Sequence, residues 1–173
     1  MTQHLYVDGG CVGRNPSKIG GTWAWCHVID DEMVRWDFGV VRPMDACLDA
    51  ITNNFTELLA AVYGLEAMEE ESLAKLNRKW KGIVHTDSKV TLRRLTDGKR
   101  FNGIPQWLRL LALDLRRDRK WTPVLIGGHP TKAELRTGYR KGTKLPVSEW
   151  NAWCDEACRE EAKRFLDSKG GKG

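Results

Sequence analysis

The sequence predicts a mixed α/β domain whose central sheet is covered by helices on both faces. Strand-like alternation dominates the first 40 residues, apolar residues then recur at three- and four-residue intervals, and short strand-like runs alternate with these helical segments. We expect a five-stranded mixed sheet, with three antiparallel strands followed by parallel ones. It lies in a single domain over residues 1–167, with a flexible tail at 168–173.

The first part of the chain is predicted to form three strands joined by tight links. Residues 5–8 alternate in polarity and end at a glycine pair, and a second alternating run covers residues 23–29. An acidic turn at 30–32 leads into a third run at 34–40. Consecutive strands with short links pair antiparallel, so this region predicts a meander.

The rest of the chain is predicted to alternate helices with two short strands. An apolar stripe from Phe55 to Met68 indicates a long amphipathic helix. A strand at 82–87 is followed by Ser88, which can cap a helix that runs through Leu95. The remaining predicted elements are a helix at 106–117 that begins after Pro105, a strand at 123–126 and a helix from about 148 to 167.

Composition narrows the class of protein. Twenty-eight Lys and Arg against 23 Asp and Glu give a net charge of +5, which favours a polyanionic ligand. The 29% charged residues and the lack of a long apolar run argue against a membrane span. Five cysteines without C-x-x-C spacing indicate free thiols in a reducing compartment. The N-terminus does not resemble a signal peptide, so we expect a cytoplasmic protein, and a monomer.

Four acids stand where they can meet. Asp8 ends the first strand, Asp87 ends the fourth, Glu57 begins the long helix and Asp155 lies on the last one. If the two strands are neighbours, these carboxylates form a cluster of hard oxygen ligands that suits Mg²⁺. Two metal ions roughly 4 Å apart would support phosphodiester hydrolysis. The alternative is that these acids are solvated surface groups.

Four short blocks, in this order, resemble ribonuclease HI. The first is Tyr6-Val7-Asp8-Gly9-Gly10-Cys11 with Asn15-Pro16 after it, and the second runs from Thr52 through Glu57 to Ala61. The third is Thr86-Asp87-Ser88, and the fourth joins Gly128-His129 to the block from Asn151 to Ala157. The resemblance spans residues 5 to about 165 and implies the ribonuclease H-like fold.

This resemblance implies an endonuclease that hydrolyses the RNA strand of an RNA–DNA hybrid and leaves 5′-phosphate and 3′-hydroxyl ends. Asp8, Glu57, Asp87 and Asp155 would bind two Mg²⁺ ions, with Mn²⁺ as a substitute. His129 would lie on a mobile loop and assist proton transfer or product release, a role that suits an imidazole.

The resemblance also implies a substrate-binding set. Asn15, Asn53 and Asn54 match positions that contact the hybrid through its minor groove, where the 2′-hydroxyl distinguishes RNA from DNA. Thr52 matches a position near the phosphates of the DNA strand. The set further includes Gly9, Cys11, Ser88 and Lys89. Turn and helix-cap chemistry is the alternative explanation for the short polar residues.

The chain departs from the family pattern at five places. Gly10 stands where the family commonly has Ser, Arg14 is an extra loop residue, and Lys89 replaces a common Gln. The stretch between Leu95 and Trp107 is too short for the basic protrusion of many bacterial members. An insertion-like segment at 132–144 carries basic residues and an aromatic ring, among them Arg136, Tyr139, Arg140 and Lys141. It is either a hybrid-gripping element or a solvated charged loop.

Two other functions stay open at this point. The first is another nuclease of the same superfamily, such as a transposase, integrase or junction resolvase, although these usually lack the Asn53-Asn54 block and the glutamate at this helix position. The second is a non-catalytic hybrid- or RNA-binding module. The four acids count against that module, since clustered negative charge would repel phosphates.

Three further clusters predict ordinary packing. Cys154 and Cys158, four residues apart on a helix, are expected in the core or at its boundary, and the acidic run 69–71 is expected on a solvated helix face. The alternating tryptophans of the meander are expected to face the core of the sheet, and they are Trp23, Trp25 and Trp36.

Overall fold

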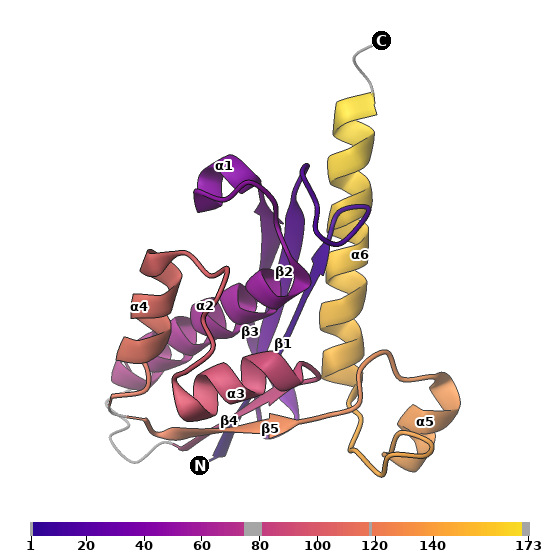
Figure 1. Cartoon of the computed structure of the whole chain (residues 1–173). Helices are drawn as coiled ribbons and strands as arrows, with labels where there is room; N and C mark the ends of the chain where they lie inside the picture. The colour runs from indigo at the N-terminus through magenta and orange to yellow at the C-terminus, as the bar shows by residue number, and fades with distance from the viewer. Residues whose placement is uncertain (1, 75–80, 118, 171–173) are drawn as a thin grey trace.

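A computed structural model describes residues 2–74, 81–117 and 119–170, and a five-stranded mixed sheet forms its centre (Figure 1). The strand order is β3-β2-β1-β4-β5. The strands are β1 (Thr2–Cys11), β2 (Gly21–Ile29), β3 (Glu32–Val41), β4 (Lys81–Thr86) and β5 (Trp121–Leu125). The first three pair antiparallel, whereas β4 pairs parallel with both β1 and β5, which confirms the predicted fold class.

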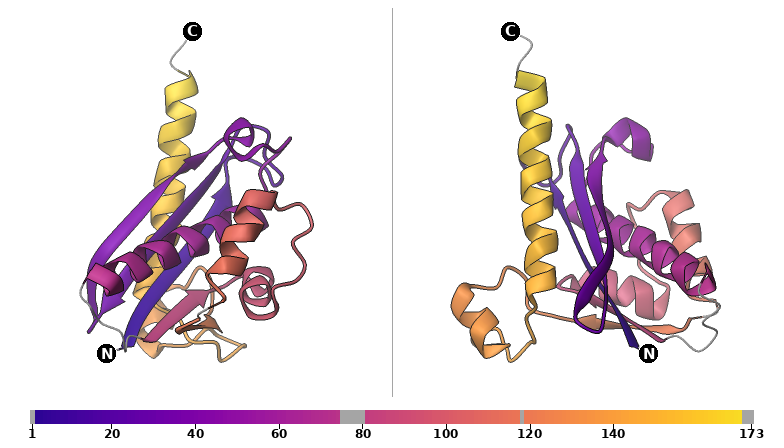
Figure 2. Two further views of the ribbon diagram at one scale, coloured as in Figure 1. Left: turned by 90° about the vertical axis from the view of Figure 1, so that its left-hand side faces the viewer. Right: turned by 180° about the vertical axis from the view of Figure 1, so that it is seen from behind.

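Helices cover both faces of this sheet (Figure 2). Three of them, α2 (Asn53–Ala74), α3 (Lys89–Asp97) and α4 (Gln106–Asp114), lie on one face, and α6 (Glu149–Gly170) lies on the other. Strand residues divide between two cores accordingly, because successive side chains of a strand point to opposite faces. Leu5, Val7 and Trp25 belong to the core beneath α2, and Tyr6, Ala24 and Cys26 to the core beneath α6.

Helix and strand ends follow local sequence signals. Ser88 caps α3 by accepting a hydrogen bond from the Thr91 amide at 3.2 Å, as predicted, and Gly98 ends that helix in the left-handed conformation. Two short helices, α1 (Pro43–Ala46) and α5 (Lys132–Thr137), were not predicted. Strand β5 begins two residues before the predicted start, and its Pro123 is tolerated because β5 lies at an edge of the sheet.

The contact between α2 and β1 is unusually close. A Cβ atom on Gly9 would lie 2.5 Å from the main-chain nitrogen of Glu57 and 2.5 Å from the carbonyl carbon of Thr56. Farther along the helix, a Cβ on Gly64 would lie 2.7 Å from Leu5 Cδ1. Glycine at these two positions therefore lets the helix backbone rest on the strand, and the first contact fixes the position of Glu57.

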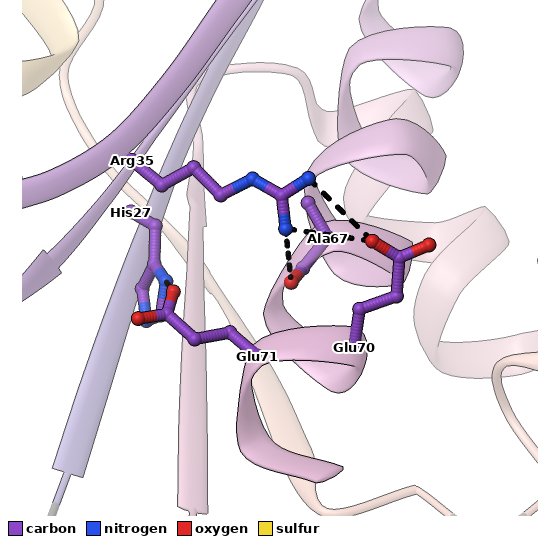
Figure 3. A network of polar contacts seen from close by, with 5 residues as sticks. All are labelled: His27, Arg35, Ala67, Glu70 and Glu71. Atoms are coloured by element: carbon purple, nitrogen blue, oxygen red, sulfur yellow. Dashed lines mark hydrogen bonds and ion pairs between the residues drawn. The ribbon is translucent and has the colours of Figure 1, made fainter. Parts of the chain in front are cut away.

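Two packing predictions are wrong in part and one is confirmed. Trp25 lies in the core and Trp23 packs against it as expected, and Glu70 is exposed, whereas Trp36 and Glu71 depart from the prediction. The indole of Trp36 is 54% exposed, because β3 is an edge strand and α6 lies mainly over the inner strands. Glu71 does not lie on a solvated face. Its Oε2 is 3.0 Å from Nδ1 of the fully buried His27, beside an ion pair between Arg35 and Glu70 (Figure 3). The cysteines of α6, Cys154 and Cys158, are buried as expected.

The ends of the chain add little to the site. Helix α6 continues to Gly170, three residues beyond its expected end, and residues 171–173 lie outside the described part. The single domain over 1–167 and the flexible tail at 168–173 stay predictions. Of the helices described, none combines the length and the apolar character needed to cross a bilayer.

We predict that Gly9→Ala destabilises the protein far more than Gly10→Ala. The new methyl group at residue 9 would meet helix backbone, which cannot move aside, so we expect a loss of about 1–3 kcal/mol in the free energy of unfolding. At residue 10 the nearest atom is Thr22 Oγ1 at 3.4 Å, and we expect a change within about 0.5 kcal/mol. Urea unfolding measures both, and equal losses would contradict the close α2–β1 contact.

Candidate active site

Four carboxylates converge where the ends of two parallel strands meet two helices. Asp8 lies near the end of β1 and Asp87 directly follows β4, which is hydrogen-bonded to β1. Glu57 comes from the beginning of α2 and Asp155 from α6. A pocket of about 290 Å³ is lined by Asp8, Glu57, Asp155 and His129 together with neighbouring residues. We call the four carboxylates the acid cluster.

Asp8 is the most deeply buried carboxylate of the acid cluster, at 6% exposure. Burial raises its pKa well above the ordinary value, and the charges of Asp87, Asp155 and Glu57 raise it further. A hydrogen bond of 2.7 Å from the Gly9 amide to Oδ1 acts in the opposite direction. The bare cluster therefore resists full ionisation.

The surroundings of Glu57 also disfavour its charged form. Burial raises its pKa to about 7, although hydrogen bonding from Ser88 lowers it. Its Oε2 atom is buried and accepts no hydrogen bond from any described residue. A buried carboxylate oxygen without a partner is costly, so this atom is a ready ligand for a cation.

Asp87 packs against the loop that follows β5. A Cβ on Gly128 would overlap Asp87 Oδ2, so only glycine allows the carboxylate to lie on this backbone. Burial raises the pKa of Asp87, while the positive charges of His129 and Arg140 lower it. Asp87 does not line the pocket itself but acts electrostatically on Asp8.

Both oxygens of Asp155 are engaged. Oδ1 lies 3.0 Å from Nδ1 of His129, and Oδ2 lies 2.7 Å from Nη2 of Arg159, one helical turn away. The His129 side chain is 70% exposed, and its backbone φ of 46° is in the left-handed region. With its side chains in these positions, the described part of the chain holds no group of three or more His, Cys, Asp or Glu residues arranged to bind a metal ion.

A small polar group from the predicted substrate-binding set lines the other side of the pocket. Asn15 Oδ1 accepts hydrogen bonds from the Asn53 amide at 3.3 Å and from the Cys11 thiol at 3.5 Å. Asn53 Oδ1 is buried and accepts no hydrogen bond from the residues described. Gly9, Cys11, Asn15 and Asn53 all line the pocket with the acids.

Other members of that set lie outside the pocket lining. Thr52 Oγ1 accepts from the Phe55 amide at 3.3 Å, and the Asn54 carbonyl accepts from Arg94 Nη1 at 2.7 Å. Ser88 caps α3, and Lys89 is exposed beside it. Arg136, Arg140 and Lys141 belong to the segment around α5. A local helix-end contact thus accounts for Thr52, whereas Ser88 both caps α3 and hydrogen-bonds to Glu57.

Sequence reasoning missed Arg159 and Arg94, and it did not explain Gly128. Arg159 pairs with Asp155, and its i,i+4 spacing on a helix was a usable signal. Arg94 is buried, and its charge lowers the pKa of Glu57. Neither its burial nor the close approach of Gly128 to Asp87 has a sequence signal, because both depend on long-range packing.

We predict that the metal-free protein loses stability as the pH rises. The pKa of Glu57 is about 7 in the folded chain against an ordinary 4.5, so folding favours the protonated form. The stabilisation is complete below about pH 4.5 and disappears as the pH rises through about 7, a change of about 3 kcal/mol. Urea unfolding in EDTA, followed by tryptophan fluorescence, measures it.

Glu57→Gln supplies the decisive comparison, because it removes the titrating group and keeps the shape. We expect a clearly shallower decline for this variant and an unaltered decline for Asp97→Asn, which changes an exposed acid on α3. A pH dependence that is the same in the wild type and in Glu57→Gln would show that Glu57 titrates normally.

Comparison with known proteins gives a partial sequence match. No protein-family model matches the chain. A curated protein from Acidithiobacillus ferrooxidans, named Ribonuclease H, is 38% identical over 72 residues, which are 42% of this chain and 39% of that protein. The match thus spans about two fifths of the length of this relative.

The structural similarity covers nearly the whole chain. RNase H1 from the archaeon Halobacterium salinarum superposes with a TM-score of 0.61 at 20% identity, over 95% of this chain and 99% of that one. LC11-RNase H1, isolated from compost and solved in complex with an RNA/DNA hybrid, gives 0.65 at 16% identity, over 95% and 99%. These TM-scores show that the chains share a fold. The chain thus has the fold of these RNase H1 structures, and about two fifths of it is similar in sequence to a protein named Ribonuclease H.

Proposed function

We propose that this protein is a ribonuclease HI-like endonuclease that hydrolyses the RNA strand of RNA–DNA hybrids. One observation carries the proposal: three carboxylates, Asp8, Glu57 and Asp155, line an open pocket in this fold, and Asp87 lies close enough to raise the pKa of Asp8. Structural relatives are RNase H1 proteins, and one of them was solved with an RNA/DNA hybrid. Fold alone would not support this activity, but the site residues do.

The acid cluster fits divalent metal ions. It offers hard oxygen ligands, among them the unpartnered Glu57 Oε2. Bound cations would also offset the electrostatic cost of burying these carboxylates close together. Asp8, Glu57, Asp87 and Asp155 would hold two Mg²⁺ ions, and Mn²⁺ would substitute. When bound, the metal ions supply activation of the attacking water and stabilisation of the leaving oxygen. To bind a metal ion, Asp155 would have to release His129 or Arg159.

The reaction that follows is an in-line displacement at phosphorus. A water oxygen forms the new bond to phosphorus while the bond from phosphorus to the 3′ oxygen breaks, which leaves 5′-phosphate and 3′-hydroxyl ends. The leaving 3′ oxygen needs a proton. His129 is suited to deliver it, or to assist product release, because its imidazole is exposed at the pocket and is tethered to Asp155.

Recognition of the hybrid is assigned to the polar side of the pocket. Asn15 and Asn53 lie beside the acid cluster, where amide groups can contact the minor groove and its 2′-hydroxyls. Further contacts are proposed for the flanking positions, which are Gly9, Cys11, Thr52, Asn54, Ser88 and Lys89. A monomeric state and a cytoplasmic location stay predictions.

We predict metal-dependent cutting of RNA–DNA hybrids. The assay offers a labelled hybrid beside RNA duplex, DNA duplex and single-stranded RNA, with Mg²⁺, Mn²⁺ or EDTA. Only the hybrid should be cut, and only with metal. Asp87→Asn should lose more than about 100-fold in rate because it removes a metal ligand, whereas Asp97→Asn should keep the wild-type rate.

Other outcomes would redirect the assignment. Cutting of duplex DNA would favour a resolvase- or integrase-like nuclease. Tight binding of the hybrid without cutting under either metal would favour the non-catalytic binding module. Full activity of Asp87→Asn would contradict the proposed site even if the hybrid were cut.

A further inference from the structure

The segment between His129 and α6 forms an ordered unit that protrudes beside the lower end of α6 (Figures 1 and 2). Residues 131–147, which we call the basic clasp, contain α5 and the return to α6. Main-chain hydrogen bonds close it on itself, from Arg140 to Leu145 at 2.8 Å and from Val147 to Gly138 at 3.1 Å. A bond from the Gly127 amide to the Pro146 carbonyl, also 2.8 Å, fastens it to the end of β5.

Glu134 organises the interior of the clasp. Its Oε2 accepts from the Thr131 amide at 2.9 Å and from the Thr131 hydroxyl at 3.1 Å, which completes a capping box on α5. Its Oε1 accepts from the Lys141 amide at 2.9 Å. These bonds lower the pKa of Glu134. The single acid of the clasp is thus engaged with the backbone.

The cations of the clasp form no close ion pair with any described carboxylate. Five basic side chains accompany the single acid, and they are Lys132, Arg136, Arg140, Lys141 and Lys144. Across residues 2–74, 81–117 and 119–170, no ion pair within 4.0 Å joins any of the five to a carboxylate. Four of them are exposed, and Tyr139 beside them is 59% exposed. Such a surface lacks anions, and phosphates would supply them.

The clasp also reaches the edge of the acid cluster. Arg140 packs on the Gly127 backbone, where an added Cβ would lie 2.9 Å from Arg140 Cβ. The next residue, Gly128, carries the Asp87 carboxylate on its backbone. Two consecutive glycines, Gly127 and Gly128, therefore connect Arg140 of the clasp to Asp87 of the acid cluster.

We infer that the basic clasp is a pre-ordered phosphate-binding arm, which holds the backbone of a nucleic-acid duplex whose scissile strand lies at the acid cluster. The inference rests on the proposed function and adds the element that grips the substrate outside the pocket. Phosphate contacts fix position and register but read no sequence. The clasp therefore supplies affinity, and selection of the RNA strand stays with the pocket.

Salt dependence tests the number of phosphate contacts. A fluorescent RNA–DNA hybrid is titrated in EDTA, without cutting, between about 50 and 200 mM salt, and log Kobs is plotted against log salt. The triple variant Arg136→Gln/Lys141→Gln/Lys144→Gln should lower the slope by about two to three, since each lost contact removes about 0.9. A DNA duplex should lose affinity to a similar extent, because the contacts read no sequence.

A matched control removes equal charge elsewhere. Lys81→Gln/Arg117→Gln/Lys120→Gln alters three exposed cations at the end of the sheet opposite Asp87, and it should leave the slope nearly unchanged. Equal reductions in both triple variants would mean that only net charge matters. An unchanged slope in the clasp variant would mean that the clasp touches no phosphate. Either result would overturn the inference.

Glu134→Ala separates geometry from charge. It removes a negative charge, so net charge alone predicts tighter binding of the hybrid. Loss of the capping box and of the Lys141 contact should instead loosen the clasp and weaken binding several-fold. Tighter or unchanged binding would overturn the pre-ordered arm.

Experiments can refute the phosphate-binding role of the clasp and the proposed nuclease activity separately. A wild-type chain that binds the hybrid with the predicted slopes and never cuts it with Mg²⁺ would refute the nuclease activity and leave the phosphate-binding arm in place. A chain that cuts the hybrid normally, with identical slopes for the wild type and the clasp variant, would refute the arm alone.

Discussion

The site depends on one close contact, the backbone of α2 resting on β1 at Gly9. Because residue 9 has no side chain, the first turns of α2 approach the strand until a Cβ would lie 2.5 Å from the Glu57 nitrogen. Asp8 and Gly9 point to opposite faces of β1, so Asp8 meets α6 while the Gly9 face meets α2. This contact places Glu57 beside Asp8, while the packing of α6 on β1 and the pairing of β4 with β1 bring Asp155 and Asp87 to the same region.

The charge balance of the site follows from that packing. The chain buries carboxylates whose mutual repulsion and desolvation raise the pKa of Asp8, Glu57 and Asp87. The two cores, one on each face of the sheet, stabilise the fold enough to hold this unfavourable arrangement. A site that is unfavourable when empty gains the most from cations, which suits metal-dependent chemistry at a phosphate.

Much of this arrangement was accessible from the sequence, for identifiable reasons. The alternation places Asp8 and Asp87 late in their strands, so their meeting was predictable once β1 and β4 were taken as neighbours. The glycine pair does not end the strand as predicted, because β1 continues through it to Cys11. The pairing of Asn15 with Asn53 could not be derived from local pattern, although the family resemblance singled out both. The exposure of Trp36 was missed because alternation does not show which strand lies at an edge. The contact of Glu71 with buried His27 was missed because a charged run looks solvated until tertiary packing is known.

Metal binding to the acid cluster is the most direct test of this account. Isothermal titration of Mn²⁺ into the wild type, Asp8→Asn, Glu57→Gln and the exposed-site control Asp97→Asn requires neither substrate nor turnover. The account predicts saturable binding by the wild type and the control, and affinity lowered more than about tenfold in both cluster variants. Equal Mn²⁺ affinity in all four proteins would contradict it, because the converging carboxylates would then not be the ligands.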